Sequence, residues 1–112
     1  MTIKKMTNKE YTQERINSDR AILRDFGTIT LQEKFIKYDR NGSGKYNIYC
    51  LAVGTDGVVR NITSLVGHVL VSYGMTLKFN NVENCFSVCS SDLSYIKMNL
   101  IEHEYPIAHY RI

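Results

Sequence analysis

The clearest periodic pattern in the chain is a helical one between residues 61 and 74. Apolar residues recur there at intervals of three and four, as on one face of an α-helix: Ile62, Leu65, Val66, Val69, Leu70 and Tyr73. Asn61 or Thr63 can cap the start of this helix, and Gly74 ends it. A helix with one continuous apolar stripe is expected to pack on a sheet.

Two segments with the composition of β-strands precede this helix. Residues 28–38 mix β-branched and aromatic side chains in partial alternation, which favours a strand with one polar face. Residues 46–53 are apolar at nearly every position, as in a central strand covered on both sides. The turn-rich residues 39–44 between them predict a hairpin. A brief third pairing over residues 58–60 is expected after an Asp-Gly turn.

Weaker patterns predict further elements toward the two ends of the chain. A capping box at residues 7–10 (Thr-Asn-Lys-Glu) predicts a peripheral helix that runs to residue 25 or 26 and stops at Gly27. Residues 84–89 predict a short strand. Residues 93–101 favour a closing helix with an imperfect period, and a strand remains the alternative.

The predicted element order is α-β-β-(β)-α-β-α, an α+β fold in which helices pack on a small, mostly antiparallel sheet. A chain of 112 residues holds one core, so a single domain over residues 1–112 is expected. It divides into a peripheral helix in 1–27, an α+β core in 28–105 and a tail in 106–112. Residues 75–83 are expected to be mostly loop or edge strand, and no local pattern fixes the tail.

Composition narrows the class of protein. With 44% hydrophobic residues and one proline, the chain has the composition of an ordinary globular domain. No apolar run approaches the ~18 residues of a membrane span, and no apolar stretch follows Lys4 and Lys5, so neither a membrane protein nor a secreted one is expected. Three cysteines favour reduced thiols, hence a cytoplasmic protein without a disulfide framework.

The net charge of +3 is unevenly distributed. Residues 1–45 carry a net charge of +4, and residues 46–112 carry −1. The bases of the N-terminal helix alternate with acids, which is typical of a solvated helix surface. No sequence-specific binding of DNA or RNA is expected, because acids share the only basic helix and the aromatic strands lack interleaved bases.

The motifs that carry known chemistry are each incomplete. Residues 39–45 begin like a calcium loop, but Cys50 stands where a bidentate glutamate is needed. The Gly-Ser-Gly-Lys run inside this segment lacks the hydroxyl residue and the helix of a phosphate-binding loop. The only trio available for nucleophilic catalysis is Cys89, His68 and Asp92, and no histidine has partners at metal-ligand spacing. We therefore expect a protein that is not an enzyme, with no catalytic residues, no metal and no cofactor.

One segment carries a family resemblance. Residues 89–95 (Cys-Ser-Ser-Asp-Leu-Ser-Tyr) resemble the Cys-Gly-Met-Asp-Met-Gly-Phe motif of a family of small, poorly characterised bacteriophage proteins. Residues 43–46 stand where that family has a Ser-Gly-Met-Ser-Arg loop, and residues 57–63 resemble its turn and helix start. The resemblance covers about residues 35–101, although serines replace both motif glycines and both methionines are lost. It implies a phage protein in an infected bacterial host without defining an activity.

Two functions are expected from these observations. The first is a phage accessory protein that binds and inhibits a component of host defence or regulation through its basic helix and hairpin loop. The expected contact residues are Arg15, Arg20, Arg24, Arg40, Asn41 and Lys45. A host protein is then the partner, no membrane is involved, and a homo-oligomer is left open.

The alternative function is binding of a small ligand, such as a host signalling nucleotide that the protein would sequester. Its phosphate would be held at the junction between strand and helix near residue 90, where hydroxyls and backbone N–H groups meet. The residues expected at this site are Arg60, Ser90, Ser91 and Asp92, with Lys45 as a second source of positive charge.

Overall fold

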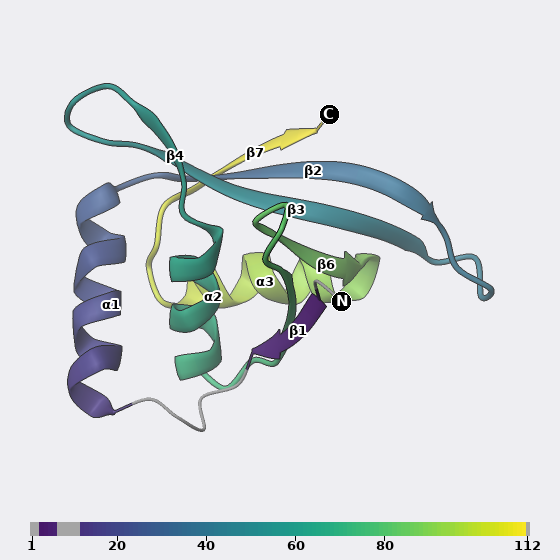
Figure 1. The fold of residues 1–112 in the computed structure, drawn as a ribbon, viewed down its shortest axis with the longest axis horizontal. Coiled ribbons are helices and arrows are strands. Elements are labelled where there is room, and N and C mark those ends of the chain that lie inside the picture. Colours follow the sequence, from purple (N-terminus) through teal and green to yellow (C-terminus); the bar gives the residue numbers. More distant parts are fainter. Residues whose placement is uncertain (1–2, 7–11, 112) are drawn as a thin grey trace.

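The computed structural model describes residues 3–6 and 12–111 of the chain, and it has the α+β fold that the sequence predicts (Figure 1). The elements follow one another along the chain as β1 (Ile3–Met6), α1 (Gln13–Phe26), β2 (Ile29–Tyr38), β3 (Gly44–Val53), β4 (Val59–Asn61), α2 (Thr63–Ser72), β5 (Leu77–Asn80), β6 (Cys85–Cys89), α3 (Ser90–Glu102) and β7 (Ile107–Arg111).

The strands form one sheet in the order β1-β5-β6-β3-β2-β7. All pairs are antiparallel except β2 with β7, which is parallel. Strand β3 is central, because β2 pairs along one of its edges while β6 and β4 share the other. Its inward side chains Ile48, Cys50 and Ala52 are buried, and burial raises the pKa of the Cys50 thiol.

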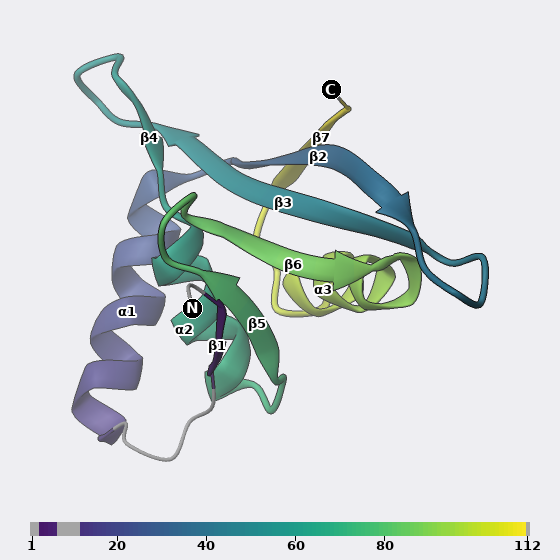
Figure 2. The ribbon, with the colours of Figure 1, turned by 45° about the vertical axis from the view of Figure 1, so that its right-hand side comes forward.

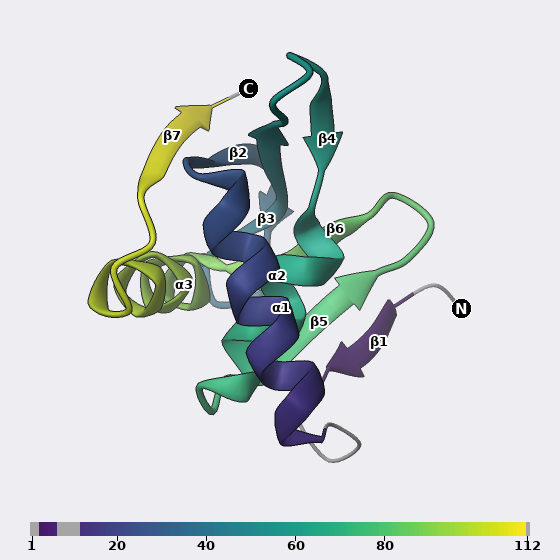
Figure 3. The same cartoon turned by 90° about the vertical axis from the view of Figure 1, so that its left-hand side faces the viewer.

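The helices lie in two layers on one face of the sheet (Figure 3). Helices α2 and α3 contact the strands, and α1 packs on the outside of α2. Because α2 is covered on both sides, its buried residues extend beyond the single predicted stripe to Thr63, Gly67 and Val71. No helix in the described ranges is long and apolar enough to span a membrane.

The ends of the chain differ most from the prediction. Helix α1 begins at Gln13, where the Thr12 hydroxyl accepts from the backbone N–H of Arg15; the expected capping box at residues 7–10 lies outside the described residues. Residues 3–6, for which the sequence predicts no strand, form β1 and pair with β5. The tail forms β7, which pairs with β2. The closing element α3 is a helix, so the strand alternative was wrong.

Candidate functional site

A pocket opens where β5 and β6 diverge. These strands pair only at Phe79 with Phe86 and at Asn80 with Cys85; beyond that point β5 continues beside β1 and β6 beside β3. Helix α3 closes the gap and leaves a pocket of about 480 Å³, within the ~300–1,000 Å³ usual for small-molecule sites. The lining residues are Lys45, Met75, Thr76, Leu77, Lys78, Ser87, Val88, Cys89, Asp92, Tyr95 and Asn99.

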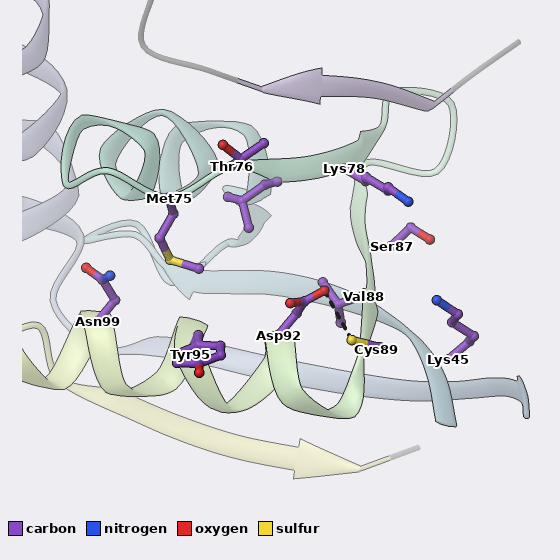
Figure 4. Close-up of a pocket in the computed structure, with 11 residues that line it drawn as sticks. Lys45, Met75, Thr76, Lys78, Ser87, Val88, Cys89, Asp92, Tyr95 and Asn99 are labelled. Atoms are coloured by element: carbon purple, nitrogen blue, oxygen red, sulfur yellow. Dashed lines mark hydrogen bonds between the residues drawn. The ribbon is translucent and has the colours of Figure 1, made fainter. Parts of the chain in front are cut away.

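The two ends of the pocket differ in chemistry (Figure 4). Lys45 and Lys78 lie at one end together with Ser87, whereas Met75 and Asn99 lie at the other. Lys45 reaches this position because it pairs with Cys89 in the β3–β6 ladder. Lys78 is exposed because it alternates with the buried Leu77 and Phe79 along β5. The pocket is therefore positively charged at one end and mostly apolar toward the other.

Helix α3 provides the polar wall of the pocket. Asp92, Tyr95 and Asn99 are spaced by three and four residues, so they share one face of the helix, while Leu93 and Ile96 are buried against the core. At the start of the helix the Cys89 thiol donates to Asp92 Oδ2 over 3.2 Å. The Asn99 side-chain oxygen is buried and has no hydrogen-bond partner within the described part of the chain. Of these oxygens, the exposed Asp92 carboxylate is the one that the wall offers to a donor on a bound molecule.

Of the residues expected to bind a small ligand, some line the pocket and others lie outside it. Asp92 lines the pocket, and so does Lys45. Ser90 and Ser91 lie in the first turn of α3 but are exposed outside the pocket.

The expected role of Arg60 in this site was wrong. Arg60 pairs with Ala52, seven residues along β3 from Lys45, which is a distance of about 23 Å at ~3.3 Å per residue. Its guanidinium instead binds Asp56, with one N–O distance of 2.6 Å. The hydrogen bond from Arg60, followed by that from the backbone N–H of Val58, lowers the pKa of Asp56 well below its usual range.

The expected protein-contact residues do not form one surface. Helix α1 with Arg15, Arg20 and Arg24 lies at one end of the molecule, and the β2–β3 turn with Arg40 and Asn41 lies at the other (Figure 1). The molecule is 41 Å long in this direction. One compact partner surface therefore cannot contain both groups.

Two of the α1 arginines have structural contacts. Arg20 donates to the hydroxyl and the carbonyl of Ser72, at 3.1 and 3.2 Å, and its guanidinium lies 4.1 Å from the centre of the Tyr73 ring. Arg24 donates to the His103 carbonyl at 2.9 Å and lies 4.3 Å from the centre of the Tyr105 ring. We call the five residues Arg20, Arg24, Tyr73, His103 and Tyr105 the α1 anchor. They attach α1 to the rest of the fold.

The trio considered for catalysis is not assembled. Cys89 and Asp92 are in contact, but His68 lies on α2 with its Nδ1 atom 4.0 Å from Asp19 of α1, and it is not among the pocket residues. A cysteine nucleophile is typically activated by an adjacent base, which His68 does not provide here. Within the described residues, no three His, Cys, Asp or Glu side chains are placed to hold a metal ion.

Several pocket residues were not predicted from the sequence. Met75, Thr76 and Lys78 fall in a segment expected to be mostly loop or edge strand, and only the tertiary fold brings them to α3. Tyr95 and Asn99 carry a local signal, because their spacing from Asp92 places all three on one helix face. Cys89 was considered for nucleophilic catalysis and not for ligand binding, and it is half-buried and lines the pocket.

The chain matches no protein-family model, no curated protein and no solved structure. The resemblance of residues 89–95 to a phage family therefore stays a prediction. The functional argument rests on the geometry of the molecule itself.

Proposed function

We propose that this protein binds a small organic anion in the pocket between β5, β6 and α3. The observation that carries this proposal is the polarity of the pocket, with Lys45 and Lys78 at one end and the apolar Met75 beside the Asn99 side chain at the other. Binding pockets for small molecules typically combine apolar walls with a few such polar groups.

The lining residues indicate the chemistry of the ligand. The two lysines favour a phosphate or carboxylate at their end of the pocket. Met75, Leu77, Val88 and Tyr95 offer apolar and aromatic surface to the body of the ligand. Asp92 favours hydroxyl or amino groups on that body, since a carboxylate accepts hydrogen bonds.

A nucleotide meets these three requirements in one molecule, with phosphate, planar base and hydroxyl donors. The sequence-based alternative of a protein that sequesters a signalling nucleotide is therefore our leading proposal, with Lys78 in the place expected for Arg60. We propose binding without turnover, because the Cys89–Asp92 pair lies in the pocket without the histidine that nucleophilic catalysis needs.

The first experiment is a thermal-shift and calorimetric titration with mono-, di- and cyclic nucleotides, and with the corresponding nucleosides. A nucleotide present at a hundred times its dissociation constant should stabilise the fold by about 2.7 kcal/mol. The nucleoside should bind more weakly, since it lacks the group that meets the lysines. No stabilisation by any nucleotide or other organic anion tested at millimolar concentration would contradict the proposal.

Matched variants locate the site. Lys45→Gln and Lys78→Gln should each weaken binding about tenfold, the lower end of the effect of losing a hydrogen bond to a charged group. Arg60→Gln removes the same charge about 23 Å away along β3 and should leave binding unchanged. Equal losses in all three variants would mean that only net charge matters, and the pocket would not be the site.

Inhibition of a host defence or regulatory protein stays a second proposal. It rests on the resemblance to phage proteins, and the separation of α1 from the β2–β3 turn removes the single contact surface first expected for it. Affinity purification from infected cells, with a host protein recovered in stoichiometric amount, is the experiment that tests it.

A further inference from the structure

The free end of the β2–β3 hairpin, residues 34–46, projects from the body of the molecule (Figure 2). The pairing of β7 with β2 ends at Glu33, and the pairing of β6 with β3 begins at Lys45. Between these points, the described ladders pair the two strands of the hairpin only with each other. We call residues 34–46 the hairpin end. Its two edges are open to a partner between residues 34 and 44.

Three aromatic rings gather on the hairpin end. Phe35 lies 4.9 Å from Tyr38 and 5.6 Å from Tyr46, measured between ring centres. In a regular strand, residues 35 and 38 would point to opposite faces, but a bulge between Phe35 and Lys37 shifts the register and brings the two rings together. Phe35 is 43% exposed and Tyr38 is 70% exposed. The cluster therefore exposes aromatic ring surface of Phe35 and Tyr38 to solvent.

Gly44 is required for this arrangement. A Cβ atom at this position would lie 2.8 Å from Cε1 of the Tyr46 ring, which is closer than van der Waals contact allows. The absence of a side chain lets the Tyr46 ring cover the backbone and hold its place beside Phe35. The rings are thus positioned by the hairpin itself.

Positive charge is concentrated on the same segment. The hairpin end carries Lys34, Lys37, Arg40 and Lys45 against the single acid Asp39, a net charge of +3. The whole chain has the same net charge, so the other 99 residues are neutral overall. Basic residues do interleave with aromatic ones here, contrary to the interpretation of the sequence.

The one carboxylate of the hairpin end is used by the turn. Asp39 Oδ1 accepts from the backbone N–H groups of Asn41 and Ser43, at 2.8 and 3.0 Å. The turn is therefore shaped by the acid, while the bases beside it are directed to the surface: Lys34, Lys37 and Arg40 are exposed. Such a turn presents cations next to exposed rings.

We infer that the hairpin end binds single-stranded nucleic acid without sequence preference. Exposed rings stack on unpaired bases, and the surrounding cations contact the phosphates, which is the combination used by sequence-independent single-strand binders. A duplex hides its base faces from such rings, and an acidic protein would use the charges but not the rings. The inference shares only Lys45 with the pocket and is compatible with the expected lack of sequence-specific recognition.

The test is fluorescence anisotropy with a labelled oligothymidylate, with a duplex of equal length and heparin as competitors. We expect the single strand to bind more tightly than the duplex at the same salt concentration. The logarithm of affinity should fall linearly with the logarithm of salt, by about 0.7 for each phosphate contacted. Absence of binding at 50 mM salt, or equal binding of duplex and single strand, would overturn the inference.

Matched variants separate stacking from charge. Tyr38→Leu keeps an apolar side chain but removes the ring, and should weaken single-strand binding by about five- to 150-fold, the range for one base–aromatic stack. Tyr110→Leu changes a tyrosine that is 56% exposed on β7 and should have no effect. Arg40→Ala should lower the salt slope by about 0.7, whereas Arg15→Ala on α1 should not. Equal effects within either pair would overturn the inference, and circular dichroism confirms that each variant is folded.

Discussion

The α1 anchor and the hairpin end contain the same kinds of side chain, but these side chains contact one another differently in the two regions. Each combines cationic and aromatic residues, and they lie at opposite ends of the molecule (Figure 1). In the anchor the cations lie over the rings: Arg20 over Tyr73 and Arg24 over Tyr105. In the hairpin end the rings contact one another, and Phe35 and Tyr38 remain exposed.

The difference shows what decides whether a basic, aromatic segment is structural or free to bind. In the anchor, the Tyr73 ring stacks on His103 with 3.5 Å between centres, and Tyr105 is only 2% exposed. These contacts span residues far apart in the sequence, so they close the helix layer over the core. In the hairpin end, only Lys45 and Tyr46 pair with β6, and the Tyr46 ring packs on the core. The other cations and the rings of Phe35 and Tyr38 are exposed and available to a partner. Charge counts along the sequence cannot separate the two cases.

The largest contrast is expected for a pair of tyrosine truncations. Tyr105→Ala removes a buried ring from the anchor and should lower the free energy of unfolding by about 3–5 kcal/mol, as for other large-to-small changes at buried aromatic positions. Tyr38→Ala should change it by no more than about 0.5 kcal/mol, because the side chain is exposed. Urea denaturation followed by circular dichroism measures both. Similar losses would show that the two ends do not differ as the contacts indicate.

Much of this fold could be predicted where the signal is local. The period of α2 and the turn-rich loop between β2 and β3 identify those elements directly, and Gly74 follows the first of them as expected. Strands β1 and β7 have no such signal. They form by pairing with distant residues, Met6 opposite Leu77 and Ile29 opposite Ile107, which no pattern along the chain reveals.

The candidate site likewise contains residues that a local sequence pattern marks and residues that only the tertiary fold brings together. Asp92 belongs to a strand-to-helix junction that the sequence marks, and it does line the pocket. Lys78 and Met75 reach the pocket only because β5 turns away from β6 after two residue pairs. Arg60 was assigned to the site on charge alone, and its actual partner Asp56 is four residues away. The positive charge of a residue, without its position in the fold, therefore did not predict whether the residue lies in the site.

The second contrast concerns stability at alkaline pH. Burial, and then the hydroxyl of Tyr73, raises the pKa of Tyr105 to about 12, whereas an unfolded tyrosine titrates near 10. Between these values the unfolded chain has lost a proton that the folded protein keeps, so stability falls as pH rises. One such group gives a slope of at most about 1.4 kcal/mol per pH unit.

Denaturation at pH 9, 10 and 11 measures this slope. Tyr105→Phe removes one titrating group and should reduce the slope. Cys50, Cys85 and Tyr49, whose pKa values are also raised by burial, leave a residual slope. Tyr38→Phe at the hairpin end should leave the slope as it is. If Tyr105→Phe has no more effect than Tyr38→Phe, the anchor does not hold Tyr105 in its protonated form.

A smaller effect is expected for a pair of arginines. Arg20→Ala removes two hydrogen bonds to Ser72 and the contact with the Tyr73 ring, so it should cost about 1–2 kcal/mol of stability. Arg20→Lys should recover little of this loss, since a lysine cannot make the same forked contact. Arg40→Ala at the hairpin end should stay within about 0.5 kcal/mol. A loss for Arg40→Ala as large as that for Arg20→Ala would remove the distinction between the two ends.

The smallest effects on stability and binding are expected at Asp39, where two substitutions separate the charge of the side chain from its role in shaping the turn. Asp39→Asn keeps a side-chain oxygen for the N–H groups of Asn41 and Ser43 and removes the only acid of the hairpin end. Stability should therefore change by no more than about 0.5 kcal/mol, and oligothymidylate should bind about twofold more tightly, in keeping with the ~0.2–1 kcal/mol of one exposed charge interaction. Asp39→Ala removes the same charge but also the acceptor, so it should lose about 0.5–1.5 kcal/mol of stability and bind less tightly than Asp39→Asn. Weaker binding by Asp39→Asn than by the unmodified protein would contradict this account, because it would mean that the strand does not contact the positive charge at the turn.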